Sequence, residues 1–352
     1  IIAERVNVLG QMISRRDDRY SLSCNSDLSL DLIPLMRKKV GREGFIVVGE
    51  LNALLPFMPN DAEVPADEFD MLLDAGPYDL AGPPAPRVDL ISHAIGLRAA
   101  RLVRDNGTLQ IGIGSLGDGA AQSVRLRHMA PAIFASAARA LPGPPGPVDE
   151  GGIDAFEAGL YGCTEMFTQG MFELLRARVF TRAAHEGRNI TIDGGFFLGP
   201  QNFYRGLREA PDALLDRISM TSVDDVNALY GNEAVRRRER IHARFINIAM
   251  KATCLGAVTS DALDDGRVVS GVGGQYNFVA QAHELEGARS IILLKATRES
   301  ARRLESNIVW SYGTCAILSL PNTASPTCAA RQMRNASSGC SPSRMRALLT
   351  PW

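Results

Sequence analysis

Each half of the 352-residue sequence contains a short apolar run that ends in a glycine-rich turn and leads into a helical pattern. In the first half this unit comprises residues 108–114, and in the second half it comprises residues 268–275. Such a run predicts a strand, and a tight turn after it favours glycine, which has no side chain to accommodate. The pattern therefore predicts strands that alternate with helices, which is typical of α/β layers with mainly parallel sheets.

The same criteria predict further elements along the chain. The predicted strands are short and apolar, with turn residues nearby: Phe45–Val48, Thr108–Ile111, Asn189–Ile192, Arg267–Ser270 and Ser290–Leu294. The predicted helices are Leu90–Arg104, Ala120–His128, Met171–Arg178, Arg240–Ala252, Phe278–Leu285 and Arg298–Glu305.

Length and composition limit the class of protein. A chain of this length is long enough for two domains, each with its own core. The Pro-rich segment Leu141–Pro147 predicts the boundary between them, with the first domain at residues 1–147 and the second at residues 148–313. The 38 basic and 39 acidic residues give a net charge of −1, which argues against a general nucleic-acid-binding surface. No apolar run is long enough to span a membrane, and six cysteines without metal spacing favour reduced thiols in a cytoplasmic protein.

The last 39 residues, 314–352, differ in composition from the rest of the chain. They contain no Asp, Glu or Lys, although they hold three of the six cysteines. Neither helical nor strand periodicity runs through them. We therefore treat this tail as separate from the two domains and expect it to be disordered.

The first glycine turn, Gly112–Gly117, matches the pattern G-x-G-x-x-G after a predicted strand. One interpretation is a dinucleotide site, which would make the protein an NAD(P)-dependent oxidoreductase. That site also requires an acidic residue about 20 positions later, and residues 129–148 contain none. The other interpretation is a tight strand-to-helix turn, and both remain open from the pattern alone.

Two further segments could carry chemistry. Three glycines in four residues at Gly271–Gly274 allow successive N–H groups to point at one anion or oxyanion. Glu165 follows Gly162-Cys163-Thr164 and precedes Met166, so its carboxylate is either a solvated surface group or a placed catalytic group.

Several segments, in order, resemble the acetyl-CoA hydrolase/transferase family of class I CoA-transferases, which includes 4-hydroxybutyrate and acetate CoA-transferases. The resemblance covers about residues 45–313. Residues 162–166 resemble the family's Gly-x-His-Ser/Thr-Glu-Met box, with Cys163 in place of His. Residues 270–278 resemble its Ser-Gly-Val-Gly-Gly-Gln-Val-Asp-Phe segment, with Asn277 in place of Asp. The matching segments are residues 106–114, 162–166, 245–250, 270–278 and 306–313.

The resemblance implies two open, mainly parallel α/β domains of the CoA-transferase (NagB/RpiA-like) type, with the active site between them. It implies that Glu165 is the nucleophile and forms a glutamyl-CoA thioester. The resemblance further implies coenzyme A as a substrate, no permanently bound cofactor, no metal, a small carboxylate as second substrate, and a homodimer for the full-length protein. An inactive CoA-binding remnant is the alternative. The implied CoA and substrate contacts are Gly271, Val272, Gly273, Gly274, Gln275, Gly112, Gly114 and Asn232, and Arg298, Arg302 and Arg303 could meet CoA phosphates.

The tail is explained by a change of reading frame. The family continues with Thr-Glu-Tyr-Gly-Ile-Ala-Asp-Leu-Arg-Gly-Lys, which is missing here. When that peptide is written in G/C-ending codons, with GAA for Glu, and read one base late with the last codon completed by A, it gives the eleven residues Pro321–Arg331. We therefore expect a frameshift near Thr314 and an incomplete second domain, and the sequence before Phe45 is short for a complete first domain.

Overall fold

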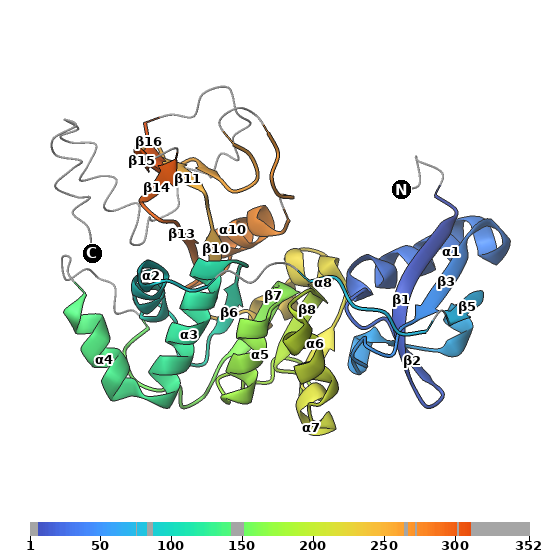
Figure 1. Cartoon of the computed structure of the whole chain (residues 1–352). Coiled ribbons are helices and arrows are strands. Elements are labelled where there is room, and N and C mark those ends of the chain that lie inside the picture. Colours follow the sequence, from blue (N-terminus) through green and yellow to red (C-terminus); the bar gives the residue numbers. More distant parts are fainter. Residues whose placement is uncertain are drawn as a thin grey trace. The chain divides into compact units, whose positions relative to one another are not determined.

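The computed structural model describes residues 6–74, 76–82, 87–141, 151–263, 267–271, 273–300 and 303–310 (Figure 1). The chain divides into two compact units, and neither unit is continuous in sequence. Unit 1 comprises residues 1–85, 161–176 and 180–239, and unit 2 comprises residues 86–160, 177–179 and 240–352. Each unit is described by itself below.

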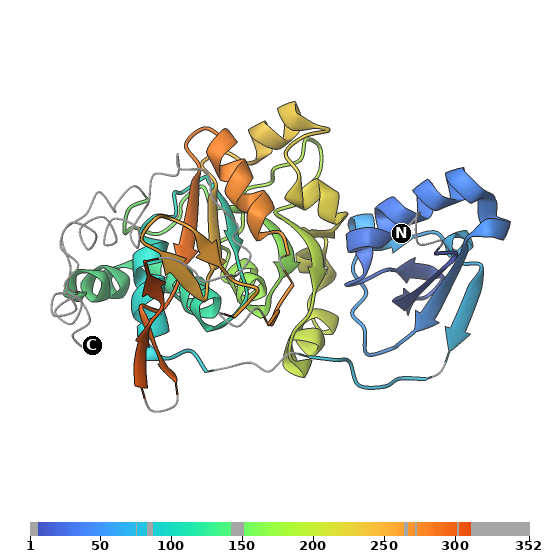
Figure 2. The same cartoon turned by 90° about the horizontal axis from the view of Figure 1, so that it is seen from above.

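The first part of unit 1 is a five-stranded sheet in the order β4-β2-β1-β3-β5. Strands β1, β3 and β5 are parallel, and β2 pairs antiparallel with β1 and β4. Helix α1 covers one face (Figure 2), and its Ile33 and Met36 pack with Ile13 and Val47 of the sheet. The elements are β1 Val8–Arg16, β2 Arg19–Ser21, α1 Ser26–Gly44, β3 Ile46–Leu51, β4 Glu63–Val64 and β5 Met71–Asp74, with 3-10 turns at Asn60–Ala62 and Ala66–Glu68.

The second part of unit 1 is a parallel group of three strands in the order β7-β8-β9. Below the strands, Phe167 packs edge-on against Phe172, and Phe203 contacts both rings, which fixes the end of β7. The elements are β7 Tyr161–Phe167, α5 Gln169–Arg176, β8 Ile192–Phe197, α6 Gln201–Arg208, α7 Asp212–Leu215, β9 Ile218–Met220, α8 Val223–Asn227 and α9 Glu233–Glu239.

Unit 2 contains a parallel group of strands in the order β13-β10-β6, with β10 in the middle. Helices α2 and α3 pack closely against each other because Gly96 and Gly119 have no side chains at the crossing. A Cβ at either position would collide with the backbone of the facing helix. Helix α10 packs on β10 through Phe278, whose ring centre lies 5.0 Å from that of Phe245. The elements are α2 Leu90–Ala100, β6 Thr108–Ile111, α3 Ser115–Met129, α4 Pro131–Ala140, β10 Arg244–Ile248, α10 Gln275–Glu284 and β13 Arg289–Leu293.

Two small sheets complete the described part of unit 2 (Figure 1). One has the order β12-β11-β16, and its core contains Ala249, Ala252, Val258 and Leu294. The other is the antiparallel hairpin β14-β15. The strands are β11 Lys251–Thr253, β12 Val258–Thr259, β14 Thr297–Ser300, β15 Arg303–Ser306 and β16 Ile308–Val309.

The predicted α/β class with mainly parallel sheets is confirmed. The strand predicted at Thr108–Ile111 has the observed bounds, and those predicted at 45–48, 189–192 and 290–294 overlap β3, β8 and β13. Four predicted helices, at 90–104, 120–128, 171–178 and 278–285, overlap α2, α3, α5 and α10.

Three predicted elements are wrong. The helix predicted at Arg240–Ala252 is the strand β10 followed by the start of β11; Phe245 and Ile246 are fully buried there, and a buried strand has no alternation to distinguish it from a helix. The helix predicted at Arg298–Glu305 is the β14-β15 hairpin, in which Arg298 lies opposite Glu305. The strand predicted at Arg267–Ser270 forms no ladder beyond one bridge at Val268.

Several sequence predictions lie outside the described residues. These are most of the Pro-rich boundary segment, the tail from residue 314, Val272 and Arg302. Among the residues that the structure describes, no helix combines the length and apolar character that crossing a membrane requires.

Candidate functional site

Glu165 lies near the carboxyl end of β7, at a position that is half-buried. Its Oε2 accepts a hydrogen bond of 3.0 Å from the Nδ2 group of Asn227, the last residue of α8. The carboxylate is therefore held by a neutral amide. Such an arrangement fixes the position of the oxygen atoms without neutralising their charge.

Contacts of the N-cap residue Ser222 help to position helix α8. The Ser222 hydroxyl caps the helix by accepting the N–H of Asp224 at 3.0 Å, and it donates to Asp31 of α1. One turn later, the carbonyl of Val226 lies 3.9 Å from the thiol of Cys163 on β7. The cap and the strand contact together determine where Asn227 meets Glu165.

The neighbouring strand β8 approaches the main chain of Glu165 closely at a glycine. The register places Thr164 opposite Gly194 and Met166 opposite Phe196, so Gly195 lies beside Glu165. A Cβ on Gly195 would lie 2.9 Å from the main-chain oxygen of Glu165, which is closer than real Cβ contacts. The Gly195 carbonyl also accepts a hydrogen bond of 3.0 Å from Ser26 at the start of α1.

Asn227 is the residue that the sequence analysis missed. The predicted polar contact, Asn232, is exposed, and its carbonyl instead accepts the N–H groups of Val235 and Arg236 at the start of α9. The signal for Asn227 was available in the Ser222 N-cap with Asp224 and Asp225 in the first turn. That pattern predicts a short helix ending near residue 227.

The turn predicted to bind an oxyanion leads into α10 in unit 2. Gly273 has a φ of 57°, which a residue with a side chain rarely adopts, and Gly274 occupies the N-cap position of α10. Gln275 is the first helical residue, and its side chain accepts a hydrogen bond from Ser260. Gly271 is exposed, and Val272 lies outside the described residues.

The Gly112–Gly117 turn joins β6 to α3 in unit 2. Gly112 donates its N–H to the carbonyl of Ile246 at 2.7 Å, and Gly114 has a φ of 101° at the N-cap of α3. A Cβ on Gly117 would lie 1.9 Å from the Gly112 carbonyl oxygen. The close turn alone therefore requires these glycines, and the motif needs no dinucleotide to explain it.

A second charged cluster in unit 1 lies around β8. His185 Nε2 is 2.5 Å from a carboxylate oxygen of Asp193, and its Nδ1 is 3.1 Å from Glu239. Tyr161 donates its hydroxyl hydrogen to the same oxygen of Asp193. The hydrogen bonds to Asp193 and Glu239 raise the pKa of His185 to about 10, so this ring is an imidazolium at neutral pH. Among the described residues, no group of His, Cys, Asp and Glu has the arrangement of a metal site.

Comparison with known proteins identifies a family model and several relatives. Residues 199–327 match the acetyl-CoA hydrolase/transferase C-terminal domain. The match ends within the segment that the sequence predicts to be out of frame. Over 283 residues the chain is 24% identical to the 4-hydroxybutyrate coenzyme A transferase of Clostridium kluyveri, covering 80% of this chain and 54% of that protein. The chain thus spans about half the length of this curated relative.

Solved structures show the same fold at low identity. RipA from Yersinia pestis has a TM-score of 0.66 at 22% identity, with 90% of this chain and 60% of that chain covered. A 4-hydroxybutyrate CoA-transferase from Porphyromonas gingivalis has a TM-score of 0.62 at 18% identity, covering 98% of this chain and 74% of that chain. The oxidoreductase alternative gains no support from these matches.

Proposed function

Because residues 199–327 match the acetyl-CoA hydrolase/transferase C-terminal domain and the chain is similar to a 4-hydroxybutyrate coenzyme A transferase, we propose that it transfers coenzyme A between an acyl-CoA and a small carboxylate, with Glu165 as the nucleophile. The observation that carries this proposal is the placement of Glu165. Its carboxylate lies at the end of a parallel strand, half-buried, and held by the Asn227 amide alone among its described hydrogen bonds. Ligands of open α/β sheets bind at the carboxyl ends of the strands.

The proposed reaction has two exchange steps. An oxygen of Glu165 attacks the thioester carbonyl of the acyl-CoA, the carbon–sulfur bond breaks, and an acyl-glutamyl anhydride and a CoA thiolate result. The thiolate then attacks the glutamyl carbonyl, which releases the acyl group as a carboxylate and leaves a glutamyl-CoA thioester. The second carboxylate reverses these steps and leaves as the new acyl-CoA.

The surroundings of Glu165 suit this chemistry. A cationic partner would lower the nucleophilicity of the carboxylate, whereas an amide donor keeps its full charge and fixes its direction. Gly195 on the neighbouring strand leaves the side next to the glutamate free of a side chain. The N–H groups of Gly273 and Gly274 remain our predicted donors for the oxyanion, as proposed from the sequence.

Trapping the thioester on Glu165 tests the proposal. The protein is incubated with acetyl-CoA and reduced with borohydride, and peptide mass spectrometry should locate the reduced side chain at position 165. Glu165→Gln should lower transfer by about 10³-fold or more because a carboxamide is not a comparable nucleophile. Glu173→Gln is the matched control, since Glu173 is a half-exposed glutamate on α5 that pairs only with Arg176 among its described contacts.

Two results would contradict this assignment. One is a modification at another residue in a protein that transfers CoA, and the other is full activity in the Glu165→Gln variant. Release of free CoA and acetate through the same trapped intermediate would retain Glu165 and identify water as the acceptor, making the protein a hydrolase.

Asn227 provides a finer test of the site geometry. Asn227→Ala should lower kcat about 10- to 100-fold, because the carboxylate loses the donor that orients it. KM for acyl-CoA should change less than kcat, since the amide contacts the nucleophile. Asn232→Ala, the alternative from the sequence, should leave kcat unchanged, and the reverse ranking of the two variants would contradict the described geometry.

A further inference from the structure

Helix α8 carries the amide that contacts Glu165, and it is too short to hold its own position. It has five residues, and Val226 is the buried one among them. Isolated helices shorter than about 12 residues are marginal in water, because few hydrogen bonds offset the ordering of the first turn. The position of Asn227, the last residue of α8, therefore depends on the contacts that hold this helix from outside.

One such contact comes from helix α1. The hydroxyl group of Ser222, which caps α8, donates a hydrogen bond to the carboxylate of Asp31. The same hydroxyl oxygen accepts the N–H of Asp224 at 3.0 Å. Because Ser222 is only 4% exposed, water competes little for these bonds. Asp31 and Ser222 are 191 positions apart in sequence, so the bond ties the start of α8 to a distant segment of unit 1.

Helix α1 is itself anchored beside the proposed nucleophile. Its first residue, Ser26, is fully buried and donates to the carbonyl of Gly195 at 3.0 Å. Gly195 lies next to Glu165 in the β7-β8 ladder. Helix α1 thus holds the strand beside Glu165 through Ser26, and it holds the cap of α8 through Asp31. Both contacts lie near the same end of one helix.

A second contact on α8 comes from helix α9. The guanidinium of Arg236 lies 2.5 Å from the carboxylate of Asp225 and 3.7 Å from that of Asp224, and both acids belong to α8. Arg236 also donates to the carbonyl of Tyr230, in the connection between the two helices. These bonds join neighbouring parts of one segment. They fix the shape of that segment, whereas the bond to Asp31 fixes its place relative to α1.

We propose that Asp31 is a positioning residue for the nucleophile. It holds the start of α8 through Ser222, and the end of α8 presents the Asn227 amide that directs the Glu165 carboxylate. The inference rests on the proposed CoA-transferase function. Asp31 makes its described bond to Ser222, so its effect on the reaction passes through α8. A misplacement of about 1 Å in a positioning group can lower a rate by about 10²-fold.

The charge of Asp31 is a separate property that two substitutions distinguish from its hydrogen bond. Asp31→Asn removes the charge but keeps a side-chain oxygen that accepts the Ser222 hydroxyl hydrogen. Asp31→Ala removes both the charge and the acceptor. A positioning role predicts that the asparagine variant resembles the parent and that the alanine variant does not.

Hydrogen exchange tests the link from Asp31 to α8 without any catalytic step. In the whole chain, the amides of residues 222–228 should exchange about tenfold faster in Asp31→Ala than in the parent, because the helix loses an outside contact. Asp31→Asn should stay close to the parent. Glu43→Gln is the matched control, since Glu43 is an exposed carboxylate at the other end of α1, and it should leave this segment unchanged. Mass spectrometry of the exchanged peptides measures the effect.

Kinetics test whether the link reaches the nucleophile. Asp31→Ala should lower kcat about fivefold, with a smaller change in the KM for acetyl-CoA, because the substrate contacts are retained. In the double variant Asp31→Ala/Asn227→Ala, kcat should lie within about twofold of that for Asn227→Ala alone, because both substitutions act at one contact. Multiplication of the two separate losses would show that Asp31 acts by another route, and would overturn the proposal.

The outcomes separate this inference from the proposed function. Faster exchange of α8 in Asp31→Ala, in a protein that forms no thioester at Glu165, would support the link to α8 and contradict the function. Thioester formation at Glu165 at the parent rate in Asp31→Ala would support the function and overturn the inference. Unchanged exchange of residues 222–228 in Asp31→Ala would also overturn it, whatever the activity. Equal losses of kcat in Asp31→Asn and Asp31→Ala would overturn it by assigning the effect to charge.

Discussion

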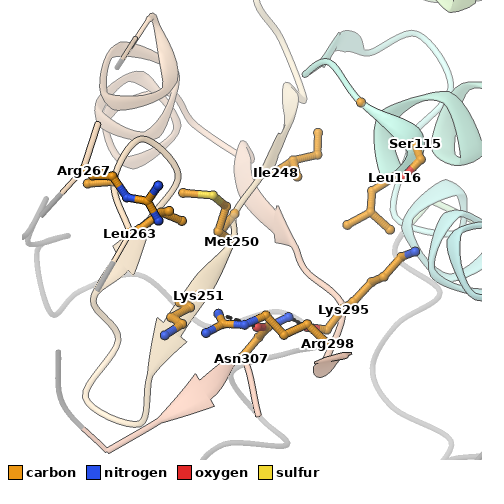
Figure 3. Close-up of a pocket in the computed structure, with 13 residues that line it drawn as sticks. Ser115, Leu116, Ile248, Met250, Lys251, Leu263, Arg267, Lys295, Arg298 and Asn307 are labelled. Atoms are coloured by element: carbon orange, nitrogen blue, oxygen red, sulfur yellow. Dashed lines mark hydrogen bonds between the residues drawn. The ribbon is translucent and has the colours of Figure 1, made fainter. Parts of the chain in front are cut away.

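Positively charged side chains lie near both ends of helix α3, but the groups that surround them differ. At the C-terminal end, Arg127 is 2% exposed and donates four hydrogen bonds, to the carbonyls of Ala100, Val103, Gly151 and Asp154. Its guanidinium also lies 4.4 Å from the centre of the Phe156 ring. At the N-terminal end, four cationic side chains line an open cavity of about 670 Å³ (Figure 3): Lys251, Arg267, Lys295 and Arg298.

The two ends differ in whether main-chain acceptors enclose the cation or the cation borders an open cavity. Main-chain carbonyls satisfy Arg127 within the chain, and a cation near a helix C-terminus is favoured by the dipole. At the other end, the side chains of Lys295 and Arg298 pair with the carboxylates of Asp89 and Glu305 and border an open cavity.

Replacing Arg127 tests the structural side of this comparison and should have the largest effect. Arg127→Met should lower the free energy of unfolding by about 3 kcal/mol or more, because four main-chain carbonyls, two of them fully buried, lose a charged donor. Urea denaturation measures the change. Arg125→Met is the control, since Arg125 is exposed on the same helix, and it should change stability by less than about 0.5 kcal/mol. Equal losses of unfolding free energy in the two variants would show that Arg127 has no special structural role.

His185 extends the comparison to a cation whose charge is balanced by two carboxylates. Hydrogen bonds to Asp193 and Glu239 raise its pKa to about 10, against an ordinary value of 6.5. The raised pKa contributes stability that is fully present below pH 6.5, declines as the pH rises above it, and is lost above about pH 10. The expected loss across this window is of order 1–2 kcal/mol after solvent screening.

Denaturation midpoints at pH 6, 8 and 10 measure this effect. His185→Gln should be less stable than the parent at pH 6, and the difference between the two should shrink toward pH 10. A difference that stays constant over the same range would show that packing, and not the imidazolium charge, accounts for the contribution of His185.

The sequence predicted the α/β class and eight element positions because strand and helix periodicities are local properties. It failed where burial or pairing decided the conformation. Phe245 and Ile246 form a central strand with neighbours on both sides, so their continuous apolar run resembles a helix. The segment Arg298–Glu305 was predicted to be a helix, but its two terminal residues pair across a hairpin.

The candidate site was predictable to a similar degree. The family resemblance pointed to Glu165, whereas its amide partner depends on where a five-residue helix ends in space, and the sequence analysis named Asn232 instead of Asn227. The cavity cations come from three separate segments, so no single motif unites them. Of these residues, the sequence analysis named only Arg298 as a candidate contact.

Removing a cavity cation should have the smallest effect on stability, and this prediction completes the comparison. Lys251→Met keeps the length of the side chain and removes a buried charge that lies among other cations. Without ligand, the free energy of unfolding should change by less than about 1 kcal/mol, because the lost interactions are offset by relief of charge burial. A loss above about 2 kcal/mol without ligand would place Lys251 with Arg127 among the structural cations.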